Sequence, residues 1–221
     1  MRVDILTLFP EMFTPLNESI IGRAKQSGKI EINIHDIRDY TENKHKKCDD
    51  YPFGGGAGMV MMAQPIASCI DAIDKEHKAR RIFMSPKGQV FTQGKMKSLL
   101  KYEWLILLCG HYEGVDQRVI DKYIDEEISI GDYVLTGGEL PAMVVTDCLA
   151  RYVDGVISQD SLSEESFTNN LLEYPQYTRP QEFMGVKVPD VLVSGNHAEV
   201  DKWRKEQSLK ITAEKRPDLL K

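Results

Sequence analysis

Short apolar runs of strand length alternate along the chain with segments of helical periodicity. Five runs have the length and composition of buried strands: Val3–Leu8, Ile30–Ile37, Arg81–Ser85, Trp104–Cys109 and Glu127–Ile130. Five segments between and after them predict helices: Glu11–Gln26, Ala63–Glu76, Thr92–Leu100, Asp116–Tyr123 and Leu140–Tyr152. In the second of these, Ile66, Cys69, Ile70 and Ile73 follow the i, i+3, i+4, i+7 spacing of one helix face. The alternation predicts an α/β fold, with a mostly parallel sheet and helices on both faces.

The composition changes after Tyr152. Residues 154–170 are acidic, rich in Ser and Asn and only weakly periodic, which is typical of a mobile linker. Three prolines then interrupt a short irregular stretch, and a basic helical segment follows from about His197 to Lys210. We therefore expect a first domain over residues 1–153, a linker over 154–172 and a small, helical C-terminal domain over 173–221.

The charge is unevenly distributed. The 28 Lys and Arg and 34 Asp and Glu give a net charge of −6, so no global basic field indicates nucleic acid. Locally, Lys75–Lys101 holds eight basic residues and one acid, and Val200–Lys221 holds seven basic residues and four acids. Such patches either bind a polyanion or form solvated helix faces, and charge alone leaves both interpretations open.

Several classes of protein are excluded by what the chain lacks. No apolar stretch approaches the 18 or more residues of a membrane span. Met1–Pro10 carries an acid inside its apolar run, so it predicts a first buried strand and not a signal peptide. The four cysteines form no CxxC pair and the five histidines form no HExxH motif, which argues against a metal site or a disulfide framework. We expect reduced, structural thiols in a cytoplasmic protein.

Three loops that contain glycine each follow a predicted strand: Ser85–Gly88, Cys109–Gly114 and Ile130–Pro141. In open α/β sheets ligands bind outside the carboxyl ends of the strands, and glycine lets the backbone come close to a ligand. No P-loop or nucleophile elbow is present, and the Gly54–Gly58 run neither follows a strand nor has the Rossmann spacing. The pattern favours a cofactor that carries the chemistry itself.

Several longer motifs resemble those of one family. They are the glycine-rich Asp49–Met59, the loops Cys109–Gly114 and Ile130–Met143, the pair Ser166-Phe167, and the segments Leu171–Pro180 and Ser194–Glu199. Their order, from one end of the chain to the other, is similar to that of the bacterial tRNA (guanine-37-N1)-methyltransferases. The resemblance implies the SPOUT fold with a deep trefoil knot, S-adenosylmethionine as methyl donor, tRNA as substrate and a homodimer without a membrane part. It also implies magnesium dependence, although the sequence offers no dedicated cluster of metal ligands.

The resemblance also assigns binding residues. The cofactor would contact Ser85, Pro86, Gly110, Tyr112, Glu113, Ile130, Gly131, Asp132, Tyr133, Val134, Leu135, Gly137, Gly138 and Pro141. Core packing is the alternative for the side chains of Ile130, Val134 and Leu135. The tRNA would contact His45, Asp49, Gly55 and Ser166, and the basic side chains of the C-terminal segment could contact phosphates: Lys202, Arg204, Lys205 and Lys210.

The reaction calls for a base and a cation. Neutral guanine carries a proton on N1, so a carboxylate can remove this proton and a guanidinium can stabilise the charge that develops toward O6. By resemblance these residues are Arg151, at the end of the predicted helix after the cofactor loops, and Glu165, where the family has an aspartate before Ser-Phe. Glu164 is the neighbouring candidate for the base.

Three other functions remain as alternatives. The first is a SPOUT methyltransferase with another RNA target, and the second is a non-catalytic RNA-binding or nucleotide-binding relative in which Glu165 marks a lost activity. The third is a dehydrogenase, which binding of S-adenosylhomocysteine or of NAD would distinguish.

Overall fold

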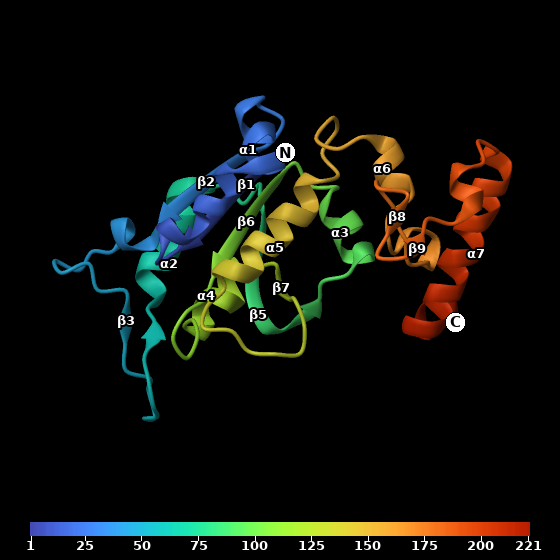
Figure 1. Ribbon diagram of the computed structural model, residues 1–221. Coiled ribbons are helices and arrows are strands. Elements are labelled where there is room, and N and C mark those ends of the chain that lie inside the picture. Colours follow the sequence, from blue (N-terminus) through green and yellow to red (C-terminus); the bar gives the residue numbers. More distant parts are fainter. The chain divides into compact units, whose positions relative to one another are not determined.

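The first part of the chain forms a five-stranded parallel sheet. In the computed structural model its strands are β1 (Arg2–Thr7), β2 (Glu31–Asp36), β5 (Arg80–Val90), β6 (Trp104–Cys109) and β7 (Glu126–Ser129). Their spatial order is β2-β1-β6-β5-β7, and every pairing within this sheet is parallel (Figure 1). The five predicted strands and the parallel sheet are confirmed, and β5 runs further than predicted, through an irregularity between Met84 and Gln89.

The structure describes residues 1–158 and 161–221 in full; the side chains of Gln159 and Asp160, in the predicted linker, lie outside this description. The chain divides into two compact units, Met1–Ile157 and Ser158–Lys221. The range predicted as a linker contributes to both units, and within the second it carries α6 (Gln159–Ser163) and the 3-10 turn η3 (Thr168–Asn170).

Helices cover both faces of the sheet. One face packs against η1 (Pro10–Asn17), α1 (Ser19–Gln26), α3 (Gln93–Leu99) and α5 (Glu139–Ala150). The other packs against η2 (Ile37–Tyr40), α2 (Ala63–Ile73) and α4 (Gln117–Tyr123). In β6 the side chains of Leu105 and Leu107 enter the first core and those of Ile106 and Leu108 the second, so the strand is apolar throughout. The prediction of helices on both faces is confirmed.

The predicted helix over Glu11–Gln26 was wrong as one element. The chain instead forms the 3-10 helix η1, which contains Pro15, and then α1, with an extended Glu18 between them (φ −105°, ψ 167°). Proline has no N–H to donate and crowds the preceding turn, so it disfavours a continuous α-helix. The apolar spacing survives the break, because Phe13 and Leu16 of η1 and Ile21 of α1 still face the same core.

Two short hairpins add to this framework. In the first unit β3 (Asp49–Asp50) pairs with β4 (Val60–Met61) and carries the glycine-rich loop between them. In the second unit β8 (Glu182–Phe183) pairs with β9 (Val186–Lys187). None of these two-residue strands was predicted, because so short a run carries no alternating pattern.

The second unit has a small core. It also contains η4 (Asp190–Val193), the long helix α7 (His197–Lys215) and η5 (Pro217–Leu220). The fully buried Thr212 of α7 accepts a hydrogen bond from the backbone N–H of Leu172 (2.8 Å) and donates one to the carbonyl of Ser208 (2.6 Å). A side chain of α7 thereby holds the segment that follows η3.

Two findings concern membrane spans and the cysteines. Among the described residues, no helix is long and apolar enough to cross a membrane. Cys48, Cys69 and Cys109 are buried, and burial raises the pKa of each of these thiols, which disfavours the reactive thiolate.

A buried carboxylate joins three strands at the second face of the sheet. Asp4 of β1 is fully buried and accepts hydrogen bonds from Trp104 Nε1 of β6 (2.6 Å) and His35 Nε2 of β2 (2.7 Å). Arg2 Nε adds a third bond of 2.7 Å. Burial by itself would raise the pKa of Asp4, but the bonds from His35, Arg2 and Trp104 outweigh it and lower this pKa to about 2.

We expect Asp4→Asn to reduce the free energy of unfolding at neutral pH by about 2 kcal/mol, because the charged acceptor of the bonds from His35, Arg2 and Trp104 is lost. The lowered pKa means that Asp4 stabilises the fold above the ordinary carboxyl pKa of 3.8, and that this stabilisation is lost as the pH falls toward 2. Urea unfolding measured from neutral pH down to about pH 2 measures both effects. Asp121→Asn, at an exposed aspartate, is the control. An unchanged pH dependence in Asp4→Asn would contradict the assignment.

Candidate functional site

A cavity of about 240 Å³ lies at the carboxyl ends of β5, β6 and β7. Phe83–Pro86 and the last two residues of β7 form part of its wall, and the loops 110–114 and 130–138 form most of the rest. The segment Ser85–Gly88, predicted as a loop, lies inside β5 at the irregularity of that strand. Neighbouring parallel strands end at the same edge of a sheet, and ligands bind in the crevice outside that edge. The expectation that the three loops gather at one edge is confirmed.

The cavity brings together 13 of the 14 residues predicted to bind a cofactor, and Asp132 is the one that does not line it. Its wall also contains seven residues that the sequence analysis missed: Phe83, Met84, His111, Gly114, Ile128, Ser129 and Thr136. Four of the seven are strand residues, and their sequence pattern indicates core packing and gives no sign that they also line a cavity. The other three lie inside the predicted loops. The sequence could have indicated them only because they adjoin predicted residues, as His111 adjoins Tyr112 and Thr136 adjoins Gly137.

Two of the glycines permit the loops to come close. The N–H of Gly138 donates to the carbonyl of Gly110 at 2.8 Å, and a Cβ on Gly138 would lie 2.8 Å from the Cα of Cys109. A Cβ on Gly110 would lie 2.8 Å from the ring of Phe83. Contacts this short exclude any side chain, so only glycine allows the backbones to form the cavity wall.

The loop after β7 forms a tight turn beside the cavity and carries exposed side chains. Gly131 N–H donates to Ser129 Oγ (3.2 Å), and Tyr133 N–H donates to the Gly131 carbonyl (2.9 Å), which closes a tight turn. Val134 is 84% exposed, so core packing does not account for its apolar side chain.

The polar groups of the wall favour a ligand that carries positive charge. Glu113 is the acid among the wall residues, and neither Lys nor Arg occurs among the described residues that line the cavity. His111 Nδ1 is buried and has no hydrogen-bond partner within the described part of the chain, although its ring packs against those of Phe9 and Tyr112. Tyr112 itself adopts the left-handed conformation (φ 58°), a strain that is typical of functional sites.

The residues predicted to contact tRNA lie on the β3–β4 hairpin or close to it, except Ser166. Asp49 pairs with Met61 in the hairpin, Gly55 lies in its exposed loop (φ 79°), and His45 is exposed before it. The hairpin adjoins the cavity, because the N–H of Glu113 donates to the carbonyl of Met59 at 3.0 Å. The fully exposed Phe53 in this loop was not predicted as a site residue.

The two predicted catalytic residues lie in different units. Arg151 caps the C-terminal end of α5 in the first unit, and Glu165 follows α6 in the second. Their approach to one another stays a prediction. The neighbouring Glu164 accepts a hydrogen bond from Tyr174 Oη (2.5 Å) and lies 3.8 Å from Arg204 Nη1, so its carboxylate is held within the second unit.

Hydrogen bonds to the backbone hold Ser166 and Phe167 against the segment 171–173. Its Oγ accepts a hydrogen bond from the N–H of Glu173 (3.0 Å), and the N–H of Phe167 donates to the carbonyl of Leu171 (2.7 Å). These bonds close a tight loop directly after Glu165. Phe167 is left-handed there (φ 73°), which marks a strained position beside the predicted base.

No group of three or more His, Cys, Asp or Glu residues that could hold a metal ion occurs within the described residues. The cavity at the sheet edge is instead lined by glycines, apolar side chains, hydroxyl-bearing residues, one histidine and one acid, Glu113. This arrangement defines a class: an α/β protein that binds an organic cofactor outside the carboxyl ends of a parallel sheet.

Comparison with known proteins gives the family. Residues 1–221 match the family model described as "tRNA (Guanine-1)-methyltransferase TrmD", and the chain belongs to this family of enzymes. Three similar relatives bear the name "tRNA (guanine-N(1)-)-methyltransferase". The one from Ruminiclostridium cellulolyticum is 60% identical over 99% of this chain and 96% of its own length. Those from Alkaliphilus oremlandii and Clostridium acetobutylicum are 58% and 57% identical over 100% and 99% of this chain and 92% and 90% of their own.

A methyltransferase of this family takes its methyl group from S-adenosylmethionine. The cavity fits this molecule on two observations: its wall offers the carboxylate of Glu113 to a cationic ligand, and the buried Nδ1 of His111 lacks a partner among the described residues. The residues that would hold the cofactor are those of the loops 110–114 and 130–138.

We expect Gly138→Ala to weaken binding of S-adenosylhomocysteine by at least about tenfold, because the new methyl group forces the loop away from Cys109. Isothermal titration calorimetry measures this effect. Gly94→Ala in α3 is the matched control, because a Cβ there meets nothing closer than 3.8 Å. Equal affinity of the two variants would show that the close approach does not shape the cofactor site.

Proposed function

We propose that this protein transfers the methyl group of S-adenosylmethionine to N1 of guanine 37 in tRNA, beside the anticodon. The observation that carries the proposal is the cavity, because one edge of the sheet gathers 13 of the 14 residues that resemblance had assigned to the cofactor. Membership of the tRNA (guanine-1)-methyltransferase family supports the reaction and the substrate class.

The cofactor would be held mainly by the backbone. The wall residues Gly110, Gly137 and Gly138 leave room for the ligand's polar groups to meet N–H and C=O groups, and Ser85, Pro86, Ile130 and Pro141 would enclose it. When bound, S-adenosylmethionine supplies an electrophilic methyl group on a positively charged sulfur. Orientation of that methyl group toward the guanine would provide a large part of the rate enhancement.

The protein's own groups would then handle the proton and the charge. Glu165 would take the proton from guanine N1, so that the N1 lone pair is available for the methyl group. Arg151 would stabilise the negative charge that develops toward O6. Glutamate has one more methylene than the family's aspartate and the same acid chemistry, so it can serve as this base.

The tRNA would contact the hairpin and the loop after Glu165. His45, Asp49 and Gly55 belong to the exposed part around the β3–β4 hairpin, which adjoins the cavity through Met59 and Glu113. Ser166 directly follows the proposed base. Magnesium dependence, the deep trefoil knot and a location in the cytoplasm stay predictions of the resemblance.

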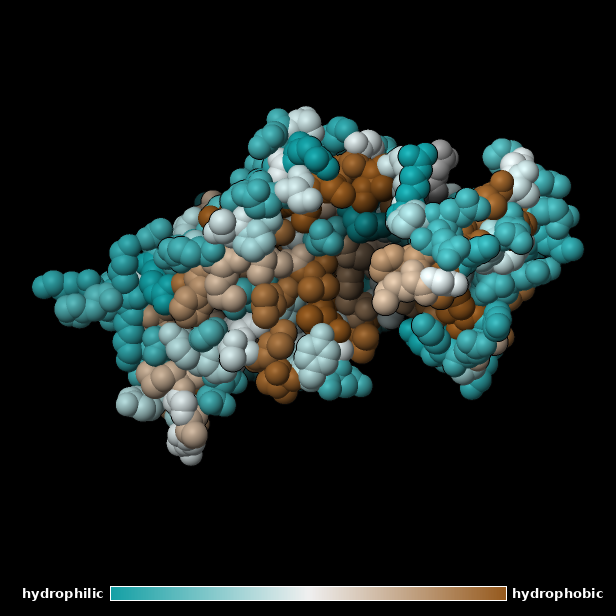
Figure 2. Space-filling model, viewed as in Figure 1, coloured by the Kyte–Doolittle hydropathy of each residue, from teal (hydrophilic) through white to brown (hydrophobic). Residues whose placement is uncertain are grey.

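A homodimer is part of the proposal. Apolar side chains of neighbouring elements are exposed on the first unit: Met12 of η1, Ile20 of α1, and Leu140 and Val144 of α5. Figure 2 shows hydrophobic residues gathered over α5 and the loops beside it. An exposed apolar patch of this kind is typical of a protein–protein interface, and a second copy of the chain would cover it.

The reaction is tested by transfer of radiolabelled methyl to an unmodified tRNA transcript with guanines at positions 36 and 37. We expect labelling of this transcript and none of a control transcript with adenine at position 37. Glu165→Gln should lower the single-turnover rate by about 10²- to 10⁴-fold, because the base is removed, while binding of S-adenosylhomocysteine stays unchanged.

Glu164→Gln is the matched control for Glu165→Gln. Its amide oxygen can still accept the hydrogen bond from Tyr174, so we expect a rate within about threefold of the parent protein. A parent protein that binds the cofactor but labels neither transcript would overturn the proposed reaction. A Glu165→Gln variant as fast as the parent would overturn only the proposed base.

We expect Val144→Asp to convert the dimer into a monomer, because a charge is placed within the exposed apolar patch. Sedimentation velocity over a range of protein concentrations measures the change. Val186→Asp makes the same substitution at an exposed valine of the β8–β9 hairpin and should leave the assembly intact. A parent protein that sediments as a monomer would refute the homodimer.

A further inference from the structure

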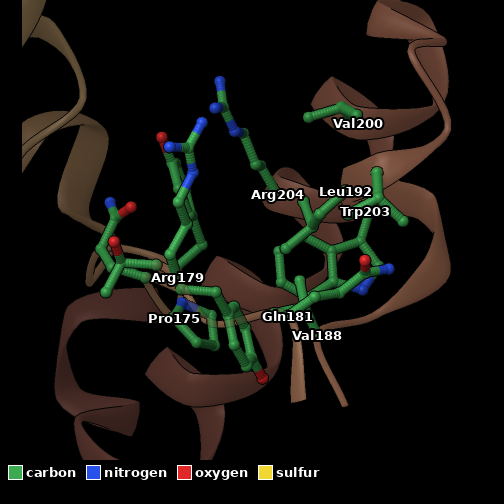
Figure 3. A pocket seen from close by; sticks show the side chains of 13 residues that line it. Pro175, Arg179, Gln181, Val188, Leu192, Val200, Trp203 and Arg204 are labelled. Atoms are coloured by element: carbon green, nitrogen blue, oxygen red, sulfur yellow. The ribbon is translucent and has the colours of Figure 1, made fainter. Parts of the chain in front are cut away.

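The second unit contains a cavity of its own, with a volume of about 460 Å³, which is within the range of ligand pockets. Figure 3 shows its wall. The first half of α7 contributes Trp203 and Arg204, and the segment 174–181 contributes most of the opposite side. None of its residues belongs to the cofactor cavity or to the predicted catalytic pair.

Flat aromatic and apolar surfaces form one part of this wall. The rings of Tyr177 and Trp203 have centroids 6.3 Å apart and planes inclined by 55°, so neither ring covers the face of the other. Tyr177 is 48% exposed. Val188 and Leu192 lie beside Trp203 and add an apolar floor. The pocket therefore presents aromatic faces to whatever enters it.

Two arginines form the charged part. Figure 3 shows the guanidinium ends of Arg179 and Arg204 on the same side of the pocket. Arg204 packs over the ring of Tyr174 at 4.8 Å, and its Nη1 lies 3.8 Å from Glu164 and 3.7 Å from Asp201. Its Nε is buried with no hydrogen-bond partner in the part of the chain that the structure describes. Arg179 is exposed, and neither Asp nor Glu occurs among the described residues that line the pocket.

We propose that this pocket binds one unpaired nucleotide of the tRNA, with its base stacked on Tyr177 and Trp203 and its phosphate held by Arg179 and Arg204. Proteins recognise single-stranded RNA by stacking unpaired bases on aromatic rings and arginine planes, while arginines neutralise the backbone. The side chains of Gln181 and Thr178 line the same pocket and can hydrogen-bond to base edges. The site rests on the proposed function, because that function makes tRNA the substrate.

The pocket combines aromatic faces with arginines, and this combination favours a nucleotide over a free anion or an apolar side chain as its ligand. A free anion would use the arginines and leave the aromatic faces without a partner. An apolar peptide side chain would use the rings and leave the exposed Arg179 beside a wall that contains neither Asp nor Glu among its described residues. A nucleotide satisfies both parts of the wall at once.

Binding of unmodified tRNA in the presence of S-adenosylhomocysteine, followed by fluorescence anisotropy, tests the site. We expect Tyr177→Leu to weaken binding about tenfold and Tyr177→Phe to change it less than about twofold, because the phenylalanine ring retains the stacking face. Arg179→Gln should weaken binding about tenfold and reduce the slope of log K against log salt by about 0.7 to 0.9, as loss of one phosphate contact does.

Lys215→Gln removes one exposed positive charge from the same helix and is the matched control. Lys215 lies eleven residues beyond Arg204, which is about 16 Å along the helix axis and well beyond the Debye length at physiological salt. We expect its affinity for tRNA to stay within about twofold of the parent. If Tyr177→Leu and Arg179→Gln bind tRNA as tightly as Lys215→Gln does, the nucleotide site is wrong.

Transcripts with a single abasic residue in the unpaired loops locate the nucleotide. Loss of the stacked base should weaken binding to the parent protein and cause no further loss in Tyr177→Leu. The single-turnover methylation rate at saturating tRNA should stay the same in all variants. Failure of the two proposals is distinguishable: a parent protein without methyl transfer refutes the reaction, whereas a normal reaction with unaltered tRNA affinity in the variants refutes the pocket.

Discussion

The backbone of Gly138 lies against the backbones of Cys109 and Gly110, and there is no space between them for even a methyl group. This single approach joins the end of β6 to the start of α5, with a hydrogen bond from Gly138 to Gly110. It brings the loop after β7 over the edge of the sheet, and so forms the wall of the cavity. Without it the three loops would still follow their strands, but they would not enclose a ligand.

The two units differ in what stabilises them. The first has two extensive apolar cores, one on each face of a parallel sheet, and the buried Asp4 network joins three of its strands. The second has little buried apolar area among its described residues and relies on hydrogen bonds such as the one that joins Thr212 of α7 to Leu172. A rigid first unit suits the positioning of a reactive methyl group, whereas a lightly built second unit suits adaptation to an irregular RNA surface.

Much of the fold was predictable, because the spacing of apolar residues and the length of each apolar run distinguish strands from helices. The five strands are apolar runs between helical segments, and their common edge follows from parallel pairing. The break between η1 and α1 was missed because apolar spacing continues across Pro15, which a period alone does not detect. The two-residue strands were missed because they contain too few positions to show a pattern.

The candidate site was predictable to the extent that it follows loop residues. Glycine content located the cavity, and resemblance located 13 of the 20 residues that line it. His111 was missed because a histidine beside a glycine gives no sign that its Nδ1 will be buried without a partner. The arginine and aromatic residues of the second cavity are separated by more than twenty positions, from Tyr177 to Trp203, and only the tertiary structure brings them together.

The close approach of Gly138 to Cys109 and Gly110 has a consequence for inhibition. A compound that competes for this cavity would lie against a wall whose shape depends on a backbone approach that leaves no room for a methyl group. A substitution at Gly138 would displace the loop and disturb binding of the enzyme's own cofactor together with binding of the compound. Resistance at this position would therefore reduce activity as well.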